Sequence, residues 1–196
     1  MRLVLCSGSP RRREMLSRLG LRFDVEVPRI AEERAPGERT DDYPERLARE
    51  KAAAGLESWR KRGGQGPAVA LAADTVVVLG GEVLEKPRDR SEGERMLRKL
   101  SGAEHRVITG VCVATDSEIR SRSVVTGVRF TDLSDAALRW LLESGDGDDK
   151  AGAYAVQGLA GAFVDRVDGS FSNVVGLPLT ETLQLLAGAG LRMPWG

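Results

Sequence analysis

The run Ala68-Val-Ala-Leu-Ala-Ala-Asp74-Thr-Val-Val-Val-Leu79 is the most apolar and most β-branched part of the chain. Near-continuous apolar character over this length is typical of a central strand that is covered on both faces. One acid, Asp74, stands inside the run, and a buried carboxylate without a partner is strongly unfavourable. We therefore expect Asp74 to meet a cation, a metal ion or hydrogen-bond donors, in either a structural or a functional role.

The segments on either side alternate between strand-like and helix-like patterns. Apolar runs predict strands at residues 3–6, 23–27, 68–79, 105–114, 123–130 and 162–167. Capping residues or prolines predict helices that begin near Ser9, Asp41, Ser91, Ser134 and Pro178. Ser91 and Glu94 fit a capping box. The runs at 105–114 and 123–130 flank a polar turn and predict a hairpin, so the fold class is α/β with a mixed sheet.

Length and charge limit the function classes. A chain of 196 residues suits a single domain, with or without two lobes. Its 29 basic and 29 acidic residues balance, which argues against a general nucleic-acid or membrane-surface binder. No run has the length of a transmembrane helix or the pattern of a signal peptide. Cys6 and Cys112 lie in apolar strand-like runs, as reduced core thiols of a cytoplasmic protein would.

The first strand runs directly into Ser7-Gly8-Ser9-Pro10-Arg11-Arg12-Arg13. Ser9 is a good N-cap and Pro10 a good first helical residue. A strand, a Ser/Gly turn and a helix start place free backbone N–H groups at the positive end of the helix dipole, which is a standard anion site. The dipole disfavours arginines there unless an anion is bound. We predict a phosphate site, with a solvated run of charge as the alternative.

Other charged residues are candidates on their own patterns. Lys51 lies at the edge of the apolar face of its helix, where a lysine usually extends to solvent but can point into a cleft. Lys86 precedes a proline and is therefore held in an extended conformation, which suits a fixed cation. Glu32 and Glu33 lie in a charged loop at residues 29–40, as surface charges or as metal ligands.

Several site types are absent from the sequence. His105 is the only histidine, and a lone histidine at the start of a strand is more often structural than catalytic. There is no His/Cys cluster with zinc spacing, no supported Ser/His/Asp set and no Walker-type loop. The segment from Gly145 to Gly152 lacks the spacing and the terminal Glu of a calcium loop.

Seven short segments carry a family pattern in order along nearly the whole chain. They are Ser7-Gly8-Ser9-Pro10-Arg11-Arg12; Arg46-Leu47-Ala48 with Lys51-Ala52; Ala73-Asp74-Thr75; Glu85-Lys86-Pro87; Leu100-Ser101-Gly102 with His105 and Thr109-Gly110-Val111; Asp149-Lys150-Ala151-Gly152-Ala153-Tyr154 with Gln157-Gly158; and Val174-Val175-Gly176-Leu177-Pro178. Together they resemble the Maf family of nucleoside triphosphate pyrophosphatases. The resemblance implies one domain over residues 1–196, with a mixed α/β fold related to inosine-triphosphate pyrophosphatases and two lobes flanking a cleft.

The resemblance also implies an activity and a cofactor. The expected reaction is hydrolysis between the α and β phosphates of a nucleotide, which gives the monophosphate and pyrophosphate with the help of Mg²⁺ or Mn²⁺. Asp74 matches the proton acceptor that activates water, and Lys51 and Lys86 match catalytic cations of the cleft. Glu32 matches a carboxylate that holds the metal together with Asp74, with Glu33 as the alternative. Such cations would offset triphosphate charge and stabilise the charge that develops in transfer.

Phosphate binding is expected at Ser7, Ser9 and Arg12. The chain is expected to bind a nucleoside triphosphate and, by resemblance alone, to form a homodimer, with no nucleic-acid or membrane partner.

Three positions, Arg11, Thr75 and Gln157, are similar to the family branch that takes dTTP and UTP. The 7-methyl-GTP branch differs, with an aromatic residue, Gln and Glu at these positions. The Gln157 amide can both donate to and accept from a uracil or thymine edge, whereas a Glu only accepts. The chain departs from the family pattern at Cys6 and Gly93, where Ala is common, and neither position touches the expected chemistry.

The primary hypothesis is a dTTP/UTP pyrophosphatase that clears unwanted pyrimidine nucleotides, modified ones included. The alternatives are a 7-methyl-GTP pyrophosphatase, disfavoured by the three positions above, and a nucleotide-binding regulator of cell division and septum formation. A regulator needs cations in its cleft but not an acid at position 74, so the intact Asp74 favours the enzyme.

Overall fold

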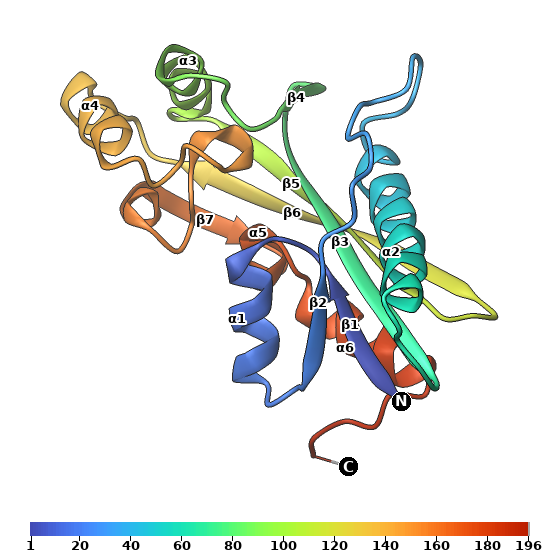
Figure 1. Ribbon diagram of the computed structural model, residues 1–196. Helices are drawn as coiled ribbons and strands as arrows, with labels where there is room; N and C mark the ends of the chain where they lie inside the picture. The colour runs from blue at the N-terminus through green and yellow to red at the C-terminus, as the bar shows by residue number, and fades with distance from the viewer. Residues whose placement is uncertain (196) are drawn as a thin grey trace. The chain divides into compact units, whose positions relative to one another are not determined.

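The computed structural model describes residues 1–195, within which there are seven strands and six α-helices (Figure 1). The strands are β1 (Arg2–Cys6), β2 (Phe23–Glu26), β3 (Ala68–Leu79), β4 (Glu82–Leu84), β5 (Glu104–Ala114), β6 (Ile119–Phe130) and β7 (Val164–Asp168). The α-helices are α1 (Pro10–Arg18), α2 (Tyr43–Lys61), α3 (Arg90–Leu100), α4 (Asp135–Ser144), α5 (Phe171–Val175) and α6 (Leu179–Gly188). Two 3₁₀ helices, η1 (Ala151–Ala153) and η2 (Leu159–Phe163), precede β7.

The strands form one mixed sheet in the order β2-β1-β3-β5-β6-β7, with β4 paired to β3. β1 runs parallel to β2 and to β3, whereas β4 is antiparallel to β3 and β7 is antiparallel to β6. The predicted α/β class with a mixed sheet is confirmed. The central strand β3 has the bounds that the apolar run predicted.

The chain divides into two compact units, as the expected two-lobe organisation requires. The first unit contains Met1–Asp74, Thr109–Val124 and the segment from Gly176 onward. The second contains Thr75–Ile108 and Val125–Val175. The strands β3, β5 and β6 each contribute residues to both units.

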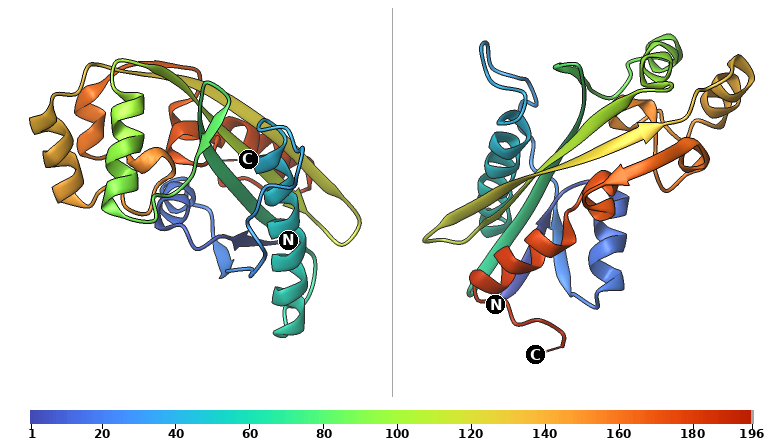
Figure 2. Two further views of the ribbon diagram at one scale, coloured as in Figure 1. Left: turned by 90° about the horizontal axis from the view of Figure 1, so that it is seen from above. Right: turned by 180° about the vertical axis from the view of Figure 1, so that it is seen from behind.

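In the first unit, helices cover both faces of the strands. Alternate residues of β1 and β3 belong to two separate clusters, because strand side chains point to opposite faces with period two. One cluster contains Leu3, Leu5, Val69 and Leu71 together with Leu16 of α1 and Leu186 of α6. The other contains Val4, Cys6, Ala70 and Ala72 together with Ala48 and Ala52 of α2. Figure 2 shows α2 and α1 on opposite sides of these strands, which fits the prediction that β3 is covered on both faces.

The same alternation fixes the direction of the acid in the central strand. Ala70 and Ala72 face α2, so Asp74, two residues further on, faces α2 as well. Helix α2 lies very close to β1, because a Cβ added at Gly55 would stand 2.3 Å from the Cys6 Sγ. Lys51 lies one turn before Gly55 on this helix, and the close packing brings it within reach of the sheet.

In the second unit, α3 and α4 pack with β5, β6 and the segment after η1 in one apolar cluster, which includes Leu97, Phe130, Leu138 and Tyr154. The short helix α5 is held by Asn173, which is fully buried. Its Nδ2 donates to the Val107 carbonyl and to the Thr126 Oγ1, both at 3.0 Å.

The capping box predicted at Ser91 and Glu94 is wrong. Helix α3 begins one residue earlier, at Arg90, and its N-cap is Asp89, whose Oδ1 accepts from the Glu92 N–H at 2.8 Å. The Glu92 carboxylate in turn accepts from the Arg88 N–H at 2.7 Å. A related pattern therefore forms two residues upstream, where an aspartate supplies the capping oxygen and the acid accepts from the residue before the N-cap, not from the N-cap itself.

The strand predicted at residues 162–167 begins later, at Val164, because the preceding residues form η2. A Cβ added at Gly161 would stand 2.5 Å from the Val156 carbonyl, so a glycine permits this tight turn. Helix α5 was not predicted, since five residues are too few to show an apolar periodicity. Over residues 1–195, no helix is both long and apolar enough to cross a membrane.

Candidate functional site

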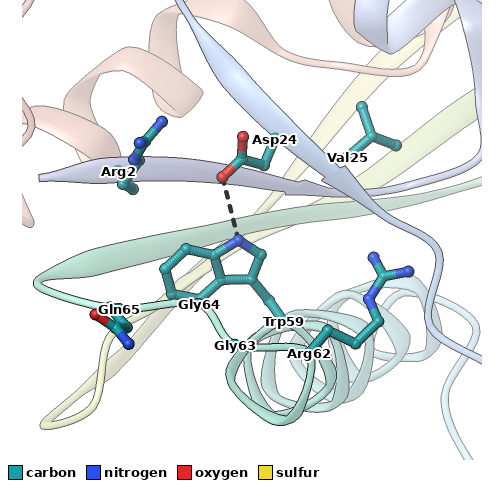
Figure 3. A pocket seen from close by; sticks show the side chains of 8 residues that line it. All are labelled: Arg2, Asp24, Val25, Trp59, Arg62, Gly63, Gly64 and Gln65. Atoms are coloured by element: carbon teal, nitrogen blue, oxygen red, sulfur yellow. Dashed lines mark hydrogen bonds between the residues drawn. The ribbon is translucent and has the colours of Figure 1, made fainter.

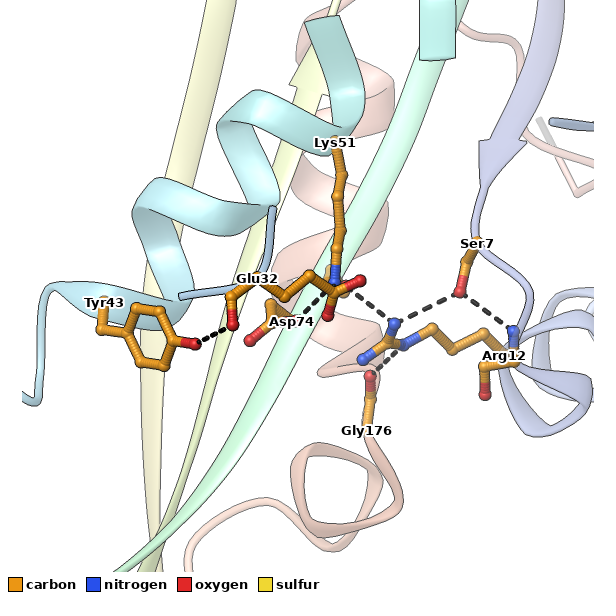
Figure 4. A network of polar contacts seen from close by, with 9 residues as sticks. Ser7, Arg12, Glu32, Tyr43, Lys51, Asp74 and Gly176 are labelled. Atoms are coloured by element: carbon orange, nitrogen blue, oxygen red, sulfur yellow. Dashed lines mark hydrogen bonds and ion pairs between the residues drawn. The ribbon is translucent and has the colours of Figure 1, made fainter. Parts of the chain in front are cut away.

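Two groups of polar contacts lie where β1 ends beside β3 in the first unit (Figure 4). The parallel pairing sets Leu5 level with Leu71, so Ser7, just after β1, comes level with Ala73. Parallel strands present their carboxyl ends at the same edge of a sheet, which is where ligands bind in open α/β folds. The register therefore brings Asp74, in the middle of β3, beside the carboxyl end of β1 and Ser7, although the two residues are far apart in the sequence.

Arg12 forms the first group of contacts. Its Nε donates to the Gly176 carbonyl at 2.7 Å, and its Nη1 donates to the Ala73 carbonyl at 2.7 Å and to the Ser7 Oγ at 3.2 Å. Burial lowers the pKa of Arg12 from its ordinary value, and the negative charge of Asp74 acts in the opposite direction. Since an arginine stays protonated even so, the site holds a fixed cation between three separate chain segments.

The turn from Ser7 to Pro10 has the predicted strand–turn–helix form. Helix α1 begins at Pro10, and Ser9 occupies the N-cap position in an extended conformation. The Ser9 side chain makes no capping bond; instead its N–H donates to the Ser7 Oγ at 3.2 Å. The geometry of an anion site is therefore present, while phosphate binding by Ser7, Ser9 and Arg12 stays a prediction.

Lys51, Asp74 and Glu32 form the second group of contacts, which we call the Lys51 cluster. The Lys51 Nζ lies 2.6 Å from the Asp74 Oδ1 and 2.7 Å from the Glu32 Oε2. Lys51 and Asp74 are 9% and 8% exposed, so of the two directions open to Lys51 in the sequence, the side chain takes the inward one and does not extend to solvent. Asp74 faces α2 and accepts a hydrogen bond from the Lys51 ammonium, which has little access to water at this buried position. Asp74 thus has the cationic partner that its burial requires.

The ion pair with Lys51 is formed by Glu32, whereas its neighbour Glu33 contacts α2 through its main-chain carbonyl. The main chain of this loop is tied to α2, because the Tyr43 hydroxyl donates to the Glu32 carbonyl at 2.9 Å. Arg46 Nη2 donates to the Glu33 carbonyl, also at 2.9 Å. The sequence analysis assigned no role to Tyr43 or Arg46. The helix itself was predicted to begin near Asp41, but a bond to a main-chain carbonyl leaves no sequence signal.

The remaining predicted residues are distributed over both units. Arg11 is half-buried in the first unit, beside Arg12 on α1. Thr75 follows Asp74 in β3 but belongs to the second unit, as do Lys86 and Gln157. Lys86 is exposed in the segment after β4, and Gln157 is exposed in the turn between η1 and η2. The roles of these residues stay predictions.

His105 lies in the second unit and makes structural contacts. Its Nε2 lies 2.8 Å from the Tyr154 hydroxyl, and its ring packs edge-on against Phe130 and Tyr154. Burial lowers the pKa of His105 to about 4, so the imidazole is neutral near pH 7. Cys6 and Cys112 are free and buried as expected, and burial raises the pKa of each thiol to about 12. Neither thiol is suited to act as a nucleophile.

A cavity of about 680 Å³ lies elsewhere in the first unit, near the start of β1 (Figure 3). It is lined by Arg2, Asp24, Val25, Trp59, Arg62, Gly63, Gly64 and Gln65. Trp59 Nε1 donates to the Asp24 Oδ2 at 3.1 Å, and Arg62 forms an ion pair with Glu26. A Cβ at Gly64 would stand 2.3 Å from the indole, so the loop backbone already covers that ring. The side chains of Trp59, Asp24 and Arg62 therefore already have hydrogen-bond or ion-pair partners within the protein. The cavity contains none of the predicted site residues.

Comparisons with known proteins identify the family of the chain. A family model described as "Maf-like protein" matches residues 2–189. The chain is 52% identical to a "dTTP/UTP pyrophosphatase" of Anaeromyxobacter dehalogenans (strain 2CP-C), with 99% of this chain and 97% of the relative covered. It is 48% identical to the protein of the same name from Hahella chejuensis, with 98% and 94% covered. It is 49% identical to that of Escherichia coli O157:H7, with 94% and 91% covered.

The family match spans nearly the whole chain, and so does each of these three alignments. The seven segments noted in the sequence lie within the matched residues, from the Ser7–Arg12 turn to Pro178. The chain belongs to the Maf family.

Proposed function

We propose that the chain hydrolyses dTTP and UTP between the α and β phosphates, releasing the monophosphate and pyrophosphate. The observation that carries the proposal is the near-complete alignment, at 48–52% identity, with relatives named dTTP/UTP pyrophosphatase. The Lys51 cluster supports it, because a carboxylate and a cation in direct contact at a strand edge can serve a hydrolytic reaction.

In this proposal Asp74 accepts a proton from the attacking water. The Asp74 Oδ1 lies 2.6 Å from the Lys51 Nζ, so the carboxylate is held by a cation in the position from which it would act on the water. Lys51 also stands ready to offset the charge of the substrate phosphates. The cluster carries one positive and two negative charges, so an incoming phosphate would compete with two carboxylates for the same ammonium.

The phosphates themselves are proposed to bind at the start of α1. The backbone N–H groups that follow Ser7 lie at the positive end of the helix dipole, and the Arg12 guanidinium adds a fixed positive charge. Lys86 is proposed as a further cation. Together these groups would stabilise the charge that builds up on the phosphoryl oxygens in the transition state.

We propose that Glu32 and Asp74 hold a Mg²⁺ or Mn²⁺ ion. Their carboxylates converge on one nitrogen at 2.7 and 2.6 Å, and carboxylate oxygens are the ligands these ions prefer, so the residues fit the group. When bound, the ion would neutralise part of the triphosphate charge. Residues 1–195 contain no cluster of three His, Cys, Asp or Glu side chains suited to a metal, so substrate phosphates and water would supply the other ligands.

The choice of a pyrimidine base is proposed to rest on Arg11, Thr75 and Gln157. The exposed amide of Gln157 can pair with both the donor and the acceptor groups of a uracil or thymine edge. Modified pyrimidine nucleotides with the same edge would be accepted as well.

The setting of the enzyme is also a proposal. The free, buried Cys6 and Cys112 suit a reducing cytoplasm, where nucleoside triphosphates are made. We propose a homodimer from the family resemblance, and the mass of the protein measured in solution by light scattering would test it.

The decisive experiment is a nucleotide panel with Mg²⁺ or Mn²⁺, with products separated by chromatography. UMP and dTMP with pyrophosphate, and little turnover of GTP, are expected. Release of orthophosphate would place the cleaved bond elsewhere, and turnover of 7-methyl-GTP would overturn the role of the three specificity residues. Nucleotide binding without turnover would instead favour a regulator of cell division.

A further inference from the structure

The loop between β2 and α2 brings an acid to the Lys51 cluster from a position that is itself open to solvent. Glu32 lies on this loop, and its side chain is 52% exposed, although its Oε2 reaches the buried Lys51 Nζ at 2.7 Å. An exposed carboxylate gains little from a single ion pair, because water competes for it. A separate restraint on the loop is needed to keep Glu32 in place.

Two residues in the first turns of α2 supply that restraint. Tyr43 is 2% exposed, and its hydroxyl donates to the Glu32 carbonyl at 2.9 Å (Figure 4). Arg46, one turn later, donates to the Glu33 carbonyl at 2.9 Å and forms a two-pronged ion pair with Glu38 at 2.6 and 3.0 Å. Its guanidinium also lies over the Tyr43 ring, 5.5 Å from the centroid.

We propose that Tyr43, supported by Arg46, is a positioning residue that holds Glu32 on Lys51 for the reaction. The inference rests on the proposed function, because only the proposed hydrolysis assigns a catalytic role to the Lys51 cluster. Neither side chain is assigned to the substrate or to the reacting atoms; Tyr43 acts through the main chain of Glu32, and Arg46 acts through Tyr43 and the loop.

Helix α2 carries both the tether residue Tyr43 and the cation Lys51. Tyr43 and Lys51 lie on the same rigid helix, eight residues or about 12 Å apart along its axis. The helix therefore places the Lys51 ammonium against Asp74. Through Tyr43 in its first turn, it also sets the distance between Glu32 and the Lys51 ammonium. If the tether is lost, Glu32 moves into solvent and Lys51 is left to Asp74 alone. The geometry of the Lys51–Asp74 contact then changes, and with it the placement of the carboxylate for the reaction.

The test measures kcat and KM of Tyr43→Phe with dTTP. This change removes one hydroxyl and leaves the buried ring in place. Loss of a single neutral hydrogen bond predicts a kcat that is lower by roughly 5-fold, with KM within about 2-fold of the wild type. Arg46→Lys keeps the charge but cannot form the two-pronged contact, and it should move kcat in the same direction by a smaller factor.

A double-mutant cycle separates positioning from a general loss of structure. If Tyr43 acts through Glu32, adding Tyr43→Phe to Glu32→Gln should reduce kcat by less than about 2-fold further. Losses that multiply fully in the double variant would overturn the inference. Tyr154→Phe is the matched control, since it removes the hydroxyl of the chain's other tyrosine, which is 5% exposed and bonded to His105. It should lower the thermal midpoint and leave kcat unchanged.

The two possible failures give different results. Wild-type protein that turns over no nucleotide would remove the proposed function and, with it, the purpose of the tether. Active wild-type protein with an unchanged kcat in Tyr43→Phe would remove the tether alone. Equal losses of kcat in Tyr43→Phe and Tyr154→Phe would likewise mean that Tyr43 has only a structural role.

Discussion

Lys51 in the first unit and His105 in the second are both buried basic side chains, but they are surrounded differently. Two carboxylates lie within 2.7 Å of the Lys51 Nζ, whereas the hydrogen-bonding partner of His105 is the neutral hydroxyl of Tyr154 at 2.8 Å. Among the described residues, the other ring nitrogen of His105 is buried without a hydrogen bond. The rings of Phe130 and Tyr154 form its remaining close surroundings.

The comparison shows how burial affects a basic side chain with and without an opposite charge beside it. Burial disfavours a charge unless an opposite charge compensates, and at His105 nothing does, so its pKa falls to about 4. Around Lys51 the buried side chains of opposite sign lie in direct contact, which offsets the cost of their burial. A retained charge in a desolvated place can act on a phosphate or a water molecule, whereas a neutral imidazole among aromatic rings serves packing. Function is therefore expected where the buried charges are kept.

The largest effect is expected from removing the acid of the retained pair. Asp74→Asn keeps the shape and leaves Lys51 its contact with Glu32, but it removes the carboxylate that is proposed to accept the proton. Turnover of dTTP should fall by about 10²–10⁴-fold, the usual contribution of general base catalysis. The measurement is monophosphate released per unit time. Asp116→Asn, at a surface ion pair with Arg60, is the matched control and should retain full activity. Full activity in Asp74→Asn would show that another group activates water.

The next effect is on stability, from removing the cation. Lys51→Met leaves Asp74 buried without its counter-charge, and breaking a buried pair in this way costs about 3–5 kcal/mol. Urea unfolding would measure the loss in free energy of unfolding. The double variant Lys51→Met with Asp74→Asn should recover part of that loss, because no charge is then left unpaired at the strand. A double variant less stable than the single one would contradict the pairing.

The fold of both units followed in large part from local patterns, but the contents of the Lys51 cluster did not. The central strand at Ala68–Leu79 was predicted with its bounds, since its apolar run is uninterrupted except at Asp74. The same run predicted that Asp74 needs a partner. The direction of Lys51 could not be predicted, because a residue at the edge of a helix face extends or turns inward according to what lies beneath it.

Two further features depend on tertiary contacts that no sequence spacing encodes. Glu32 and Glu33 are neighbouring acids of one charged loop, and the resemblance favoured Glu32; the ion pair with Lys51 and the bond from Tyr43 to the Glu32 carbonyl agree with that choice. The cap of α3 was misplaced because Asp89 and Ser91 both suit an N-cap and both have an acid three residues later. In each case two local solutions were close in free energy, and packing decided between them.

The third effect is the pH dependence that follows from the neutral His105. Its pKa is about 4 in the folded protein against 6.5 for an ordinary histidine. Between these values the unfolded chain binds a proton that the folded protein does not. The contribution of His105 to stability is therefore complete above pH 6.5 and is lost as the pH falls toward 4. The full loss is about 3 kcal/mol, since one pKa unit corresponds to about 1.4 kcal/mol.

The free energy of unfolding, measured from pH 4 to 7 for wild type and His105→Gln, would test this. Glutamine can still bond the Tyr154 hydroxyl but does not titrate, so the difference between the two curves should narrow as the pH falls. Parallel curves would mean that His105 has the same pKa in the folded protein as in the unfolded chain.

The smallest effects come from one helical glycine in each unit, and they are expected to have opposite signs. A Cβ at Gly55 would stand 2.3 Å from the Cys6 Sγ and 2.7 Å from the Cys6 Cβ, so α2 would have to move away from β1. Overpacking of this kind costs about 1–3 kcal/mol, more than the helix propensity of alanine returns. Because the same helix carries Lys51, Gly55→Ala should lower both the free energy of unfolding and the turnover of dTTP.

Gly93 on α3 lies in ordinary surroundings, with its nearest neighbours for an added Cβ at 3.4 Å, on Leu142, and 3.6 Å, on Ala153. Gly93→Ala should therefore stabilise the protein by about 0.5–1 kcal/mol, because alanine restricts the unfolded chain and packs without a clash. Urea unfolding of the two variants side by side would measure the contrast. A stabilising Gly55→Ala would mean that α2 does not press on Cys6, and the close approach that brings Lys51 to Asp74 would then lose its physical basis.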